Sequence, residues 1–353
     1  MGASRLRVAV AGASGYIGAE LLRWLLRHPH VELAGATSDR LDGEPLSRGF
    51  PHLRGLTELR FHPLDAEWLA GVADVAFLAL PHMESQRVVP VLRRHRMKVI
   101  DLSADYRLHD PNDYTVWYKA PHLDAEGLGE AVYGMPELHR KAIAGARLVA
   151  APGCYPAGAI LAVAPLLTQG LARLDGIVVD GKSGVSGAGA QGRKADPMYL
   201  YTEANENVQA YAVASHRHTP EIEQELSALA GEPVRVTFTP HLVPLTRGLY
   251  TTAVVPLATP LGTGELTAVY RDFYAGEPFV RVLGEDERPT TRAVLGSNFC
   301  DVSVTADPRT GRAVCLSALD NLGKGGSANG VQILNILGGW GERSGLEAPP
   351  VYP

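Results

Sequence analysis

Residues 6–18 read LRVAVAGASGYIG, an apolar run that passes directly into a glycine-rich turn. Leu6–Ala11 predicts a buried strand, and the apolar spacing over Tyr16–Arg27 predicts the helix that follows it. A turn of spacing G-x-x-G-x-x-G between a strand and a helix can direct its backbone N–H groups toward a pyrophosphate. Glycines also mark ordinary turns, so the prediction depends on the strand and the helix around them. The predicted cofactor contacts in this turn are Gly12, Ser14, Gly15, Tyr16, Ile17 and Gly18.

The first half of the chain repeats this alternation of strands and helices. Further strands are predicted at Val31–Thr37, Val75–Leu80 and Lys98–Leu102. Such alternation is typical of an α/β fold with a Rossmann-like, doubly wound parallel sheet. After residue 154, alternating apolar and polar residues predict strands at 234–239, 249–257, 299–306 and 312–319. We therefore expect a second α+β domain with a largely antiparallel sheet.

The composition favours a soluble enzyme of two domains. The chain has 353 residues, of which 46% are hydrophobic. A net charge of −5 with scattered arginines argues against nucleic acid or an anionic membrane as the main partner. We expect a cytoplasmic protein, because the first residues show no cleavable signal and no apolar stretch could span a bilayer. Cys300 and Cys315 are expected in the core, with reduced thiols.

Cys154 stands in a second turn between a strand and a helix. Arg147–Ala151 predicts the strand, and a helix is predicted from Pro156 onward, which places Cys154 at the mouth of that helix. Orphan N–H groups and the positive end of the helix dipole favour a thiolate there, as a nucleophilic cysteine requires. The alternative is a small buried residue in a tight turn, and position alone does not decide between the two.

Two histidines, His216 and His218, precede another predicted helix. Thr219 can cap a helix that starts at Pro220, which leaves either histidine free to act as an acid or a base. Histidines at i and i+2 also resemble half a metal site, but no compatible cysteine or third histidine lies nearby, so no metal is predicted. A capped helix with surface histidines is the alternative.

The end of the second strand indicates which dinucleotide binds. A hydroxyl on Ser38 and a guanidinium on Arg40 suit a ribose 2′-phosphate, which favours NADP(H). Asp39 could instead hold a 2′-hydroxyl, and Arg40 could be a solvated loop charge.

An ordered set of motifs covers essentially the whole chain. It comprises the glycine-rich turn, Asp101–Arg107, the Cys154 turn, Lys182–Gly189, the histidine segment and Pro240–Gly248. In this order the motifs resemble the N-acetyl-gamma-glutamyl-phosphate reductases, relatives of the aspartate-semialdehyde dehydrogenases. The resemblance implies NADPH-dependent reduction of a small acyl phosphate, N-acetyl-L-glutamyl 5-phosphate, to the semialdehyde with release of phosphate, in arginine biosynthesis.

The resemblance also implies roles for single residues. Cys154 would form a thioester, and His218 or His216 would supply the acid, with His218 favoured because it directly precedes the Thr219 cap. Arg107 matches a substrate-phosphate site, although a structural salt bridge is its alternative. The other predicted substrate contacts are Ser183, Arg217 and His241, and the remaining cofactor contacts are Ser186, Gly187, Asn321 and Lys324.

The same resemblance divides the chain and suggests its assembly. Residues 1–153 and 322–353 would form a discontinuous NADP-binding domain, and residues 154–321 the catalytic and dimerisation domain. The chain would act as a homo-oligomer, a dimer or a tetramer.

Two other functions stay open. One is a reductase of carrier-protein-bound aminoadipyl or glutamyl phosphate, which would share the nucleotide motif and the cysteine. The other is a non-catalytic NADP-sensing protein, which would not need a cysteine at a helix mouth.

Overall fold

The computed structural model describes residues 5–190 and 196–352, and these fall into two compact units. One unit runs to Pro152 and resumes over Gly326–Ala348, and the other comprises Gly153–Gly325 and resumes at Pro349. The sequence assigned 322–325 and the last residues to the nucleotide domain, whereas they group with the second unit. The last residues are held there because the Val351 N–H donates to the Leu295 carbonyl over 2.8 Å. None of the helices in the described residues has both the length and the apolar character that a membrane crossing needs.

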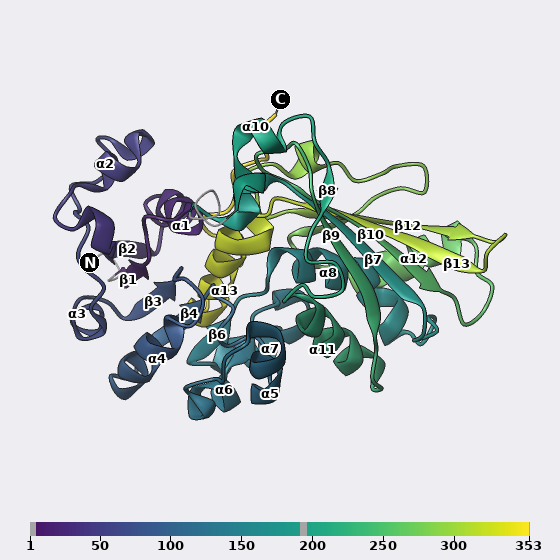
Figure 1. The fold of residues 1–353 in the computed structure, drawn as a ribbon, viewed down its shortest axis with the longest axis horizontal. Coiled ribbons are helices and arrows are strands. Elements are labelled where there is room, and N and C mark those ends of the chain that lie inside the picture. Colours follow the sequence, from purple (N-terminus) through teal and green to yellow (C-terminus); the bar gives the residue numbers. More distant parts are fainter. Residues whose placement is uncertain (1–4, 191–195, 353) are drawn as a thin grey trace. The chain divides into compact units, whose positions relative to one another are not determined.

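The first unit is built on a six-stranded parallel sheet of order β2-β1-β3-β4-β6-β5 (Figure 1). Its strands are β1 Leu6–Ala11, β2 Val31–Ala36, β3 Val75–Leu78, β4 Lys98–Asp101, β5 Val132–Tyr133 and β6 Leu148–Ala150. The strand order reverses beside β1, and doubly wound sheets bind ligands at the carboxyl ends of the strands next to such a reversal. The predicted Rossmann-like class is confirmed.

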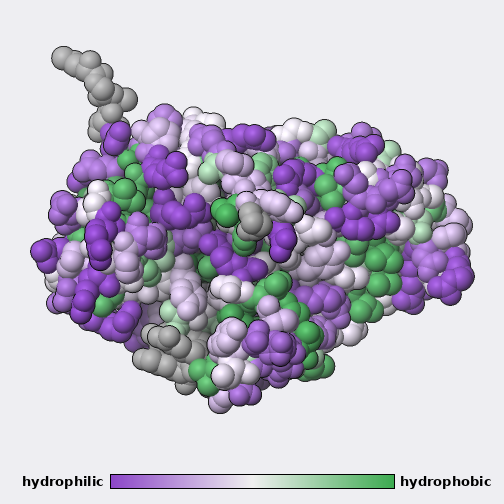
Figure 2. All heavy atoms as spheres, turned by 90° about the horizontal axis from the view of Figure 1, so that it is seen from above, coloured by the Kyte–Doolittle hydropathy of each residue, from purple (hydrophilic) through white to green (hydrophobic). Residues whose placement is uncertain are grey.

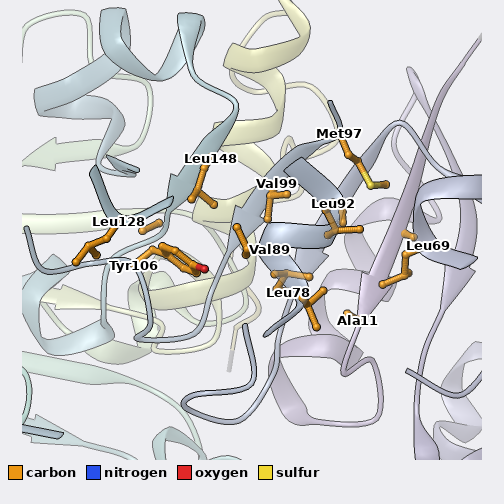
Figure 3. Close-up of a cluster of buried hydrophobic side chains, with 14 of the residues drawn as sticks. Ala11, Leu69, Leu78, Val89, Leu92, Met97, Val99, Tyr106, Leu128 and Leu148 are labelled. Carbon is orange, nitrogen blue, oxygen red and sulfur yellow. The ribbon is translucent and has the colours of Figure 1, made fainter. Parts of the chain in front are cut away.

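Helices pack on this sheet through an apolar core. They are α1 Tyr16–Leu25, α2 Leu46–Gly49, α3 Ala66–Val72, α4 Ser85–Arg94, α5 Pro111–Asp113, α6 Ala125–Glu130, α7 Pro136–Gly145 and α13 Ala328–Gly338. Figure 3 shows part of the core, where Leu69 of α3 and Val89 and Leu92 of α4 lie beside Leu78 and Val99 of the sheet. Each such side chain contributes about 1.5–3 kcal/mol when it is fully buried. This core therefore fixes the strand ends that carry the turns described below.

The second unit holds a seven-stranded mixed sheet of order β11-β12-β13-β10-β7-β9-β8. Its strands are β7 Ile177–Ser183, β8 Gln209–Ala210, β9 Val236–Leu242, β10 Leu249–Pro256, β11 Val280–Val282, β12 Cys300–Asp307 and β13 Arg312–Leu319. The pairs β7–β9 and β11–β12 are parallel, and the other pairs are antiparallel. The sheet is thus largely antiparallel, as expected, with two parallel pairs that the sequence did not indicate.

Helices α8 Cys154–Thr168, α11 Thr219–Ala230 and α12 Thr263–Phe273 cover one face of this sheet (Figure 1). The shorter helical segments of the chain are α10 Tyr201–Ala204, η1 Asp39–Leu41, η2 Pro51–Leu53, η3 Tyr114–Tyr118, η4 Val185–Ala188, η5 Pro197–Tyr199, η6 Thr291–Val294 and η7 Gly323–Ser327. Cys300 and Cys315 are fully buried free cysteines of the covered face, and burial raises the pKa of the Cys315 thiol to about 12. Their expected place in the core is confirmed.

Two helix starts differ from the sequence-based expectation. Helix α8 begins at Cys154 rather than Pro156, because a proline in the first turn lacks only an N–H that has no intrahelical acceptor there. Helix α11 begins at Thr219 with His218 as its N-cap residue. Among the described residues the Thr219 hydroxyl has no hydrogen-bond partner, so Thr219 is not the side-chain cap that we expected.

Candidate functional site

The glycine-rich turn of the first unit has the geometry that a dinucleotide requires. Gly12 has a φ of +73°, and a Cβ there would lie 2.4 Å from the Ala79 carbonyl oxygen. A Cβ on Gly18 would lie 2.5 Å from the Ala13 carbonyl oxygen, so this glycine lets α1 pack closely on the turn. Gly15 is the N-cap residue of α1. A Cβ on Gly15 would have the Gly12 oxygen as its one neighbour within 4 Å, at 3.7 Å, so space is left in front of the helix. The turn therefore fits a pyrophosphate at the N-terminus of α1.

The end of β2 is tied to this turn by hydroxyl groups. The Ser38 hydroxyl donates to the Ser14 hydroxyl over 2.8 Å, and the Gly12 N–H donates to Thr37 Oγ1 over 3.1 Å. Asp39 Oδ1 accepts the Leu64 N–H at 2.8 Å, which ties one oxygen of this carboxylate to the main chain. Arg40, two residues after Ser38, is exposed.

Arg107 is buried at the carboxyl ends of β4 and β6 in the same unit. Its Nε donates to the Ala151 carbonyl over 2.7 Å, and its Nη2 donates to the Leu102 carbonyl over 3.0 Å. Two main-chain carbonyls thus fix the plane of the guanidinium.

A buried carboxylate, Asp105, holds the loop that leads to Arg107. It accepts the N–H groups of Met83 and Ser85 at 2.8 and 3.0 Å, and it lies 2.7 Å from His82 Nδ1. Asp101 accepts the Ser85 hydroxyl at 2.8 Å; burial, together with the Asp105 charge, raises the pKa of Asp101 to about 7. Sequence reasoning missed Asp101 and Asp105, although both belong to the motif Asp101–Arg107.

In the second unit Cys154 is the first residue of α8, partly exposed and directly after the N-cap residue Gly153. The Gly153 N–H donates to Glu221 Oε1 over 2.7 Å. On the other side, a Cβ on Gly325 would lie 2.7 Å from Cys154 Cβ, so the 320–325 turn lies against the cysteine. Contacts from two segments far apart in the sequence therefore hold this turn. Glu221 is a residue that sequence reasoning did not single out.

Both histidines lie beside Tyr155, the residue next to the cysteine. The rings of His216 and His218 are 4.8 Å apart, and the Tyr155 ring lies 5.6 and 6.0 Å from them. His216 Nδ1 accepts the backbone N–H of His218 at 3.1 Å. Burial, followed by the charge of Arg217, lowers the pKa of His216 to about 4, so this imidazole is neutral at pH 7. Arg217 itself is exposed.

Another group of predicted contacts also comes together in the second unit. The Asn321 amide donates to the Ser186 hydroxyl over 2.9 Å and accepts the Gly248 N–H at 2.7 Å. A Cβ on Gly187 would lie 2.9 Å from Ser183 Oγ, so the backbone here is close to that hydroxyl. Lys324, in η7, is almost completely buried. These residues form one polar cluster, with Lys324 in the adjacent turn.

The side chain of His241, another predicted substrate contact, does not point toward this polar cluster. Along β9 successive side chains alternate between faces, and Phe238 points toward Tyr155, with ring centroids 5.4 Å apart. The His241 imidazole therefore points to the opposite face, where its Nδ1 lies 3.5 Å from Asp180 Oδ1. The backbone carbonyl of His241 accepts the Tyr155 hydroxyl at 3.0 Å.

Comparison with known proteins identifies the family. Residues 7–146 match the family described as semialdehyde dehydrogenase, NAD binding domain, and residues 154–321 match semialdehyde dehydrogenase, dimerisation domain. The N-acetyl-gamma-glutamyl-phosphate reductases of Desulforudis audaxviator and Geobacter sulfurreducens are each 50% identical to the chain over 99% of its length and 100% of theirs. The chain belongs to the N-acetyl-gamma-glutamyl-phosphate reductase family. The Moorella thermoacetica member is 49% identical over the same shares.

Solved structures of lower identity share the fold of this family. Aspartate semialdehyde dehydrogenase II of Vibrio cholerae has a TM-score of 0.73 at 20% identity, covering 95% of this chain and 98% of its own. The aspartate semialdehyde dehydrogenase of Candida albicans, solved with NADP, has a TM-score of 0.70 at 16% identity and covers 95% of this chain and 99% of its own. Both agree with the two-domain architecture described above.

We predict that Arg40 sets the preference of this family member for NADP. Arg40→Ala should weaken NADP binding by roughly 1.5–3 kcal/mol, the scale of a hydrogen bond to a charged group, and leave NAD binding nearly unchanged. Titration calorimetry with both dinucleotides measures the ratio. Arg54→Ala, at another exposed arginine of the same unit, is the control. An unchanged ratio would assign the 2′-phosphate to Ser38 or another residue.

Proposed function

We propose that the chain reduces N-acetyl-L-glutamyl 5-phosphate to N-acetyl-L-glutamate 5-semialdehyde with NADPH and releases phosphate, a step of arginine biosynthesis. Relatives of about 50% identity over the full length carry the name of this reaction. The single observation of the structure that supports it best is Cys154 at the start of α8, directly before Tyr155, whose ring contacts those of both histidines.

The first step is attack of the Cys154 thiolate on the acyl-phosphate carbonyl. The C–S bond forms and the C–O bond to phosphate breaks; the phosphate leaves with the bonding electrons and takes up a proton. The product is a thioester, which accepts hydride far more readily than a carboxylate does. Helix N–H groups stabilise the thiolate at this position, and Arg107 is the proposed ligand of the phosphate, with Ser183 and Arg217 as further substrate contacts.

NADPH, when bound, supplies the hydride that reduces the thioester. The residues that would hold it are the glycine-rich turn, Ser38 and Arg40 of the first unit, and Ser186, Gly187, Asn321 and Lys324 of the second. The reduction leaves an oxyanion on the thiohemiacetal, and the His218 imidazolium protonates it. The same imidazole takes the proton back as the C–S bond breaks, which gives the aldehyde and restores the Cys154 thiolate.

His218 is the better candidate for this acid. His216 Nδ1 is already an acceptor for the His218 backbone, and the lowered pKa of His216 keeps its ring neutral near pH 7. A neutral ring of that kind orients the loop but cannot donate the proton that the oxyanion needs.

We expect His218→Asn to slow turnover by roughly 10² to 10⁴, the usual scale of general acid–base catalysis, while Cys154 stays open to alkylation. His216→Asn should cost less. Because His216 titrates near pH 4, its replacement should leave any limb of the pH–rate profile near neutrality in place. Steady-state rates between pH 5 and pH 9 measure both effects. The opposite ranking would transfer the acid to His216.

The substrate is tested in the reverse direction. Free N-acetylglutamate semialdehyde, with phosphate and NADP, should be oxidised much faster than aspartate semialdehyde or a carrier-linked aldehyde at matched concentration. Cys154→Ser should abolish the reaction. If only the carrier-linked compound reacts, the substrate is carrier-bound aminoadipyl or glutamyl phosphate. If no aldehyde reacts while NADP binds, the chain is a sensor.

We also propose that the chain acts in the cytoplasm, where the NADPH pool for biosynthesis lies.

We further propose that the chain forms a homo-oligomer, either a dimer or a tetramer. The match to a dimerisation domain and the second face of the seven-stranded sheet support self-association. On that face Val178, Val254, Val314 and Leu316 are half-buried, and Lys182 pairs with Asp180. Figure 2 shows that apolar residues on the surface are grouped between hydrophilic ones. Homodimer interfaces bury apolar side chains of the kind that this face leaves half-exposed.

Light scattering after gel filtration should give two or four times the mass of one chain. A Val254→Glu/Leu316→Glu double variant should shift this mass toward a single chain, because two charges would be buried without partners. Thr310→Asp, in the exposed hairpin between β12 and β13, should leave the mass unchanged. A monomeric wild-type protein would refute the oligomer.

A further inference from the structure

Glu221 is a fully buried carboxylate with no role in the chemistry proposed above. Its Oε1 accepts the N–H of Gly153, the residue directly before the cysteine, at 2.7 Å. Burial of an ionised carboxylate is unfavourable unless hydrogen bonds and nearby positive charge compensate it. Glu221 lies in the first turn of α11, and its side chain reaches the first turn of α8. The positive ends of two helices thus surround this carboxylate.

The same carboxylate belongs to the helix that carries the proposed acid. His218 is the N-cap residue of α11 and Glu221 is the third residue after it. Side chains at these two positions are neighbours at a helix start. The other acids of the helix have different partners: Glu223 accepts the Val236 N–H, and Glu225 accepts the amide of Gln224. Glu221 is therefore the acid of α11 whose carboxylate contacts the cysteine turn, and it lies three residues after the N-cap histidine.

We propose that Glu221 is a positioning residue that holds the Gly153–Cys154 turn on the helix of His218 and sets the proton affinity of both reacting groups. This inference rests on the proposed function. A negative charge beside a thiol disfavours the thiolate, and the same charge beside an imidazole favours the imidazolium. Glu221 therefore offsets part of the stabilisation that the α8 N-terminus gives to the Cys154 thiolate. The same charge keeps the His218 imidazolium protonated.

Other titratable side chains lie near the same turn, and those described below are either neutral or positively charged at pH 7. Burial raises the pKa of the Tyr155 and Tyr211 phenols, so both are neutral at pH 7, and the His216 ring is neutral as well. The cationic groups are Arg217, which is exposed, and the buried Lys324 next to Gly325. Removal of the Glu221 charge should therefore shift the local potential in the positive direction.

The test combines turnover with the pH dependence of Cys154 alkylation by iodoacetamide. Glu221→Gln keeps an oxygen acceptor for the Gly153 N–H and removes the charge. Its alkylation midpoint should move to lower pH by about half a unit to one unit. Its kcat in the reverse reaction should fall about tenfold or more with little change in KM, the pattern of an interaction made in the transition state.

Two variants separate the charge from the position. Glu221→Asp keeps the charge but shortens the side chain by one methylene, so kcat should fall while the midpoint stays near that of the wild type. Glu223→Gln, a buried acid two residues further along the helix, is the matched control and should leave both quantities unchanged. Glu221→Asp also serves if Glu221→Gln does not fold, which thermal unfolding shows.

The outcomes that overturn the inference are specific. An unchanged kcat in Glu221→Asp overturns the positioning role, and an alkylation midpoint of Glu221→Gln that stays or rises overturns the role of the charge. Failure of the proposed function looks different, because the wild type itself would then not oxidise free N-acetylglutamate semialdehyde, or Cys154→Ser would retain turnover. Loss of turnover in Cys154→Ser, with Glu221 variants that match the wild type, would leave the reaction in place and reject only this inference.

Discussion

The burial of helix α8 on all sides is the constraint on which the second unit depends. From Tyr155 to Leu167 the helix is buried between the sheet and α11, and its apolar residues surround the whole helix axis. Gly158 allows a close approach to the sheet, because a Cβ there would lie 2.7 Å from Thr251 Oγ1. The Ser317 hydroxyl donates to the Gly158 carbonyl over 2.8 Å. A helix packed in this way cannot slide, so its first residue, Cys154, is fixed as well.

In the first unit the positions of the functional turns are fixed by a different constraint, the parallel arrangement of the strands. Parallel strands bring their carboxyl ends to one edge of the sheet, and the turns that follow β1, β2, β3 and β4 meet there. Asp105 ties the turn after β4 to the loop after β3, and Gly12 lies against the same loop at Ala79. The chemistry-bearing turns are therefore held by backbone contacts, and the apolar core behind them supplies the stability.

Sequence reasoning succeeded where the signal is local. The glycine-rich turn lies between a strand and a helix as predicted, and the periodicity of the strands predicted the Rossmann-like sheet. It missed Glu221 and Asp105, since their partners are backbone N–H groups far away in the chain that only tertiary packing selects. For His241 a local signal existed: it lies three residues from Phe238, so the two side chains occupy opposite faces of β9.

The distribution of buried acids explains which helix start is open to a phosphate. The N-terminus of α4 is occupied by Asp105, which accepts the Ser85 N–H, and that of α8 by Glu221, which accepts the Gly153 N–H. Each acid satisfies orphan donors and neutralises part of the helix dipole, so an added anion would meet like charge at these two ends. The first turn of α1 contains no acid and starts at Gly15, where space is open. The first turn of α1 therefore keeps N–H groups that no acid of that turn neutralises, and these can meet the pyrophosphate of a dinucleotide.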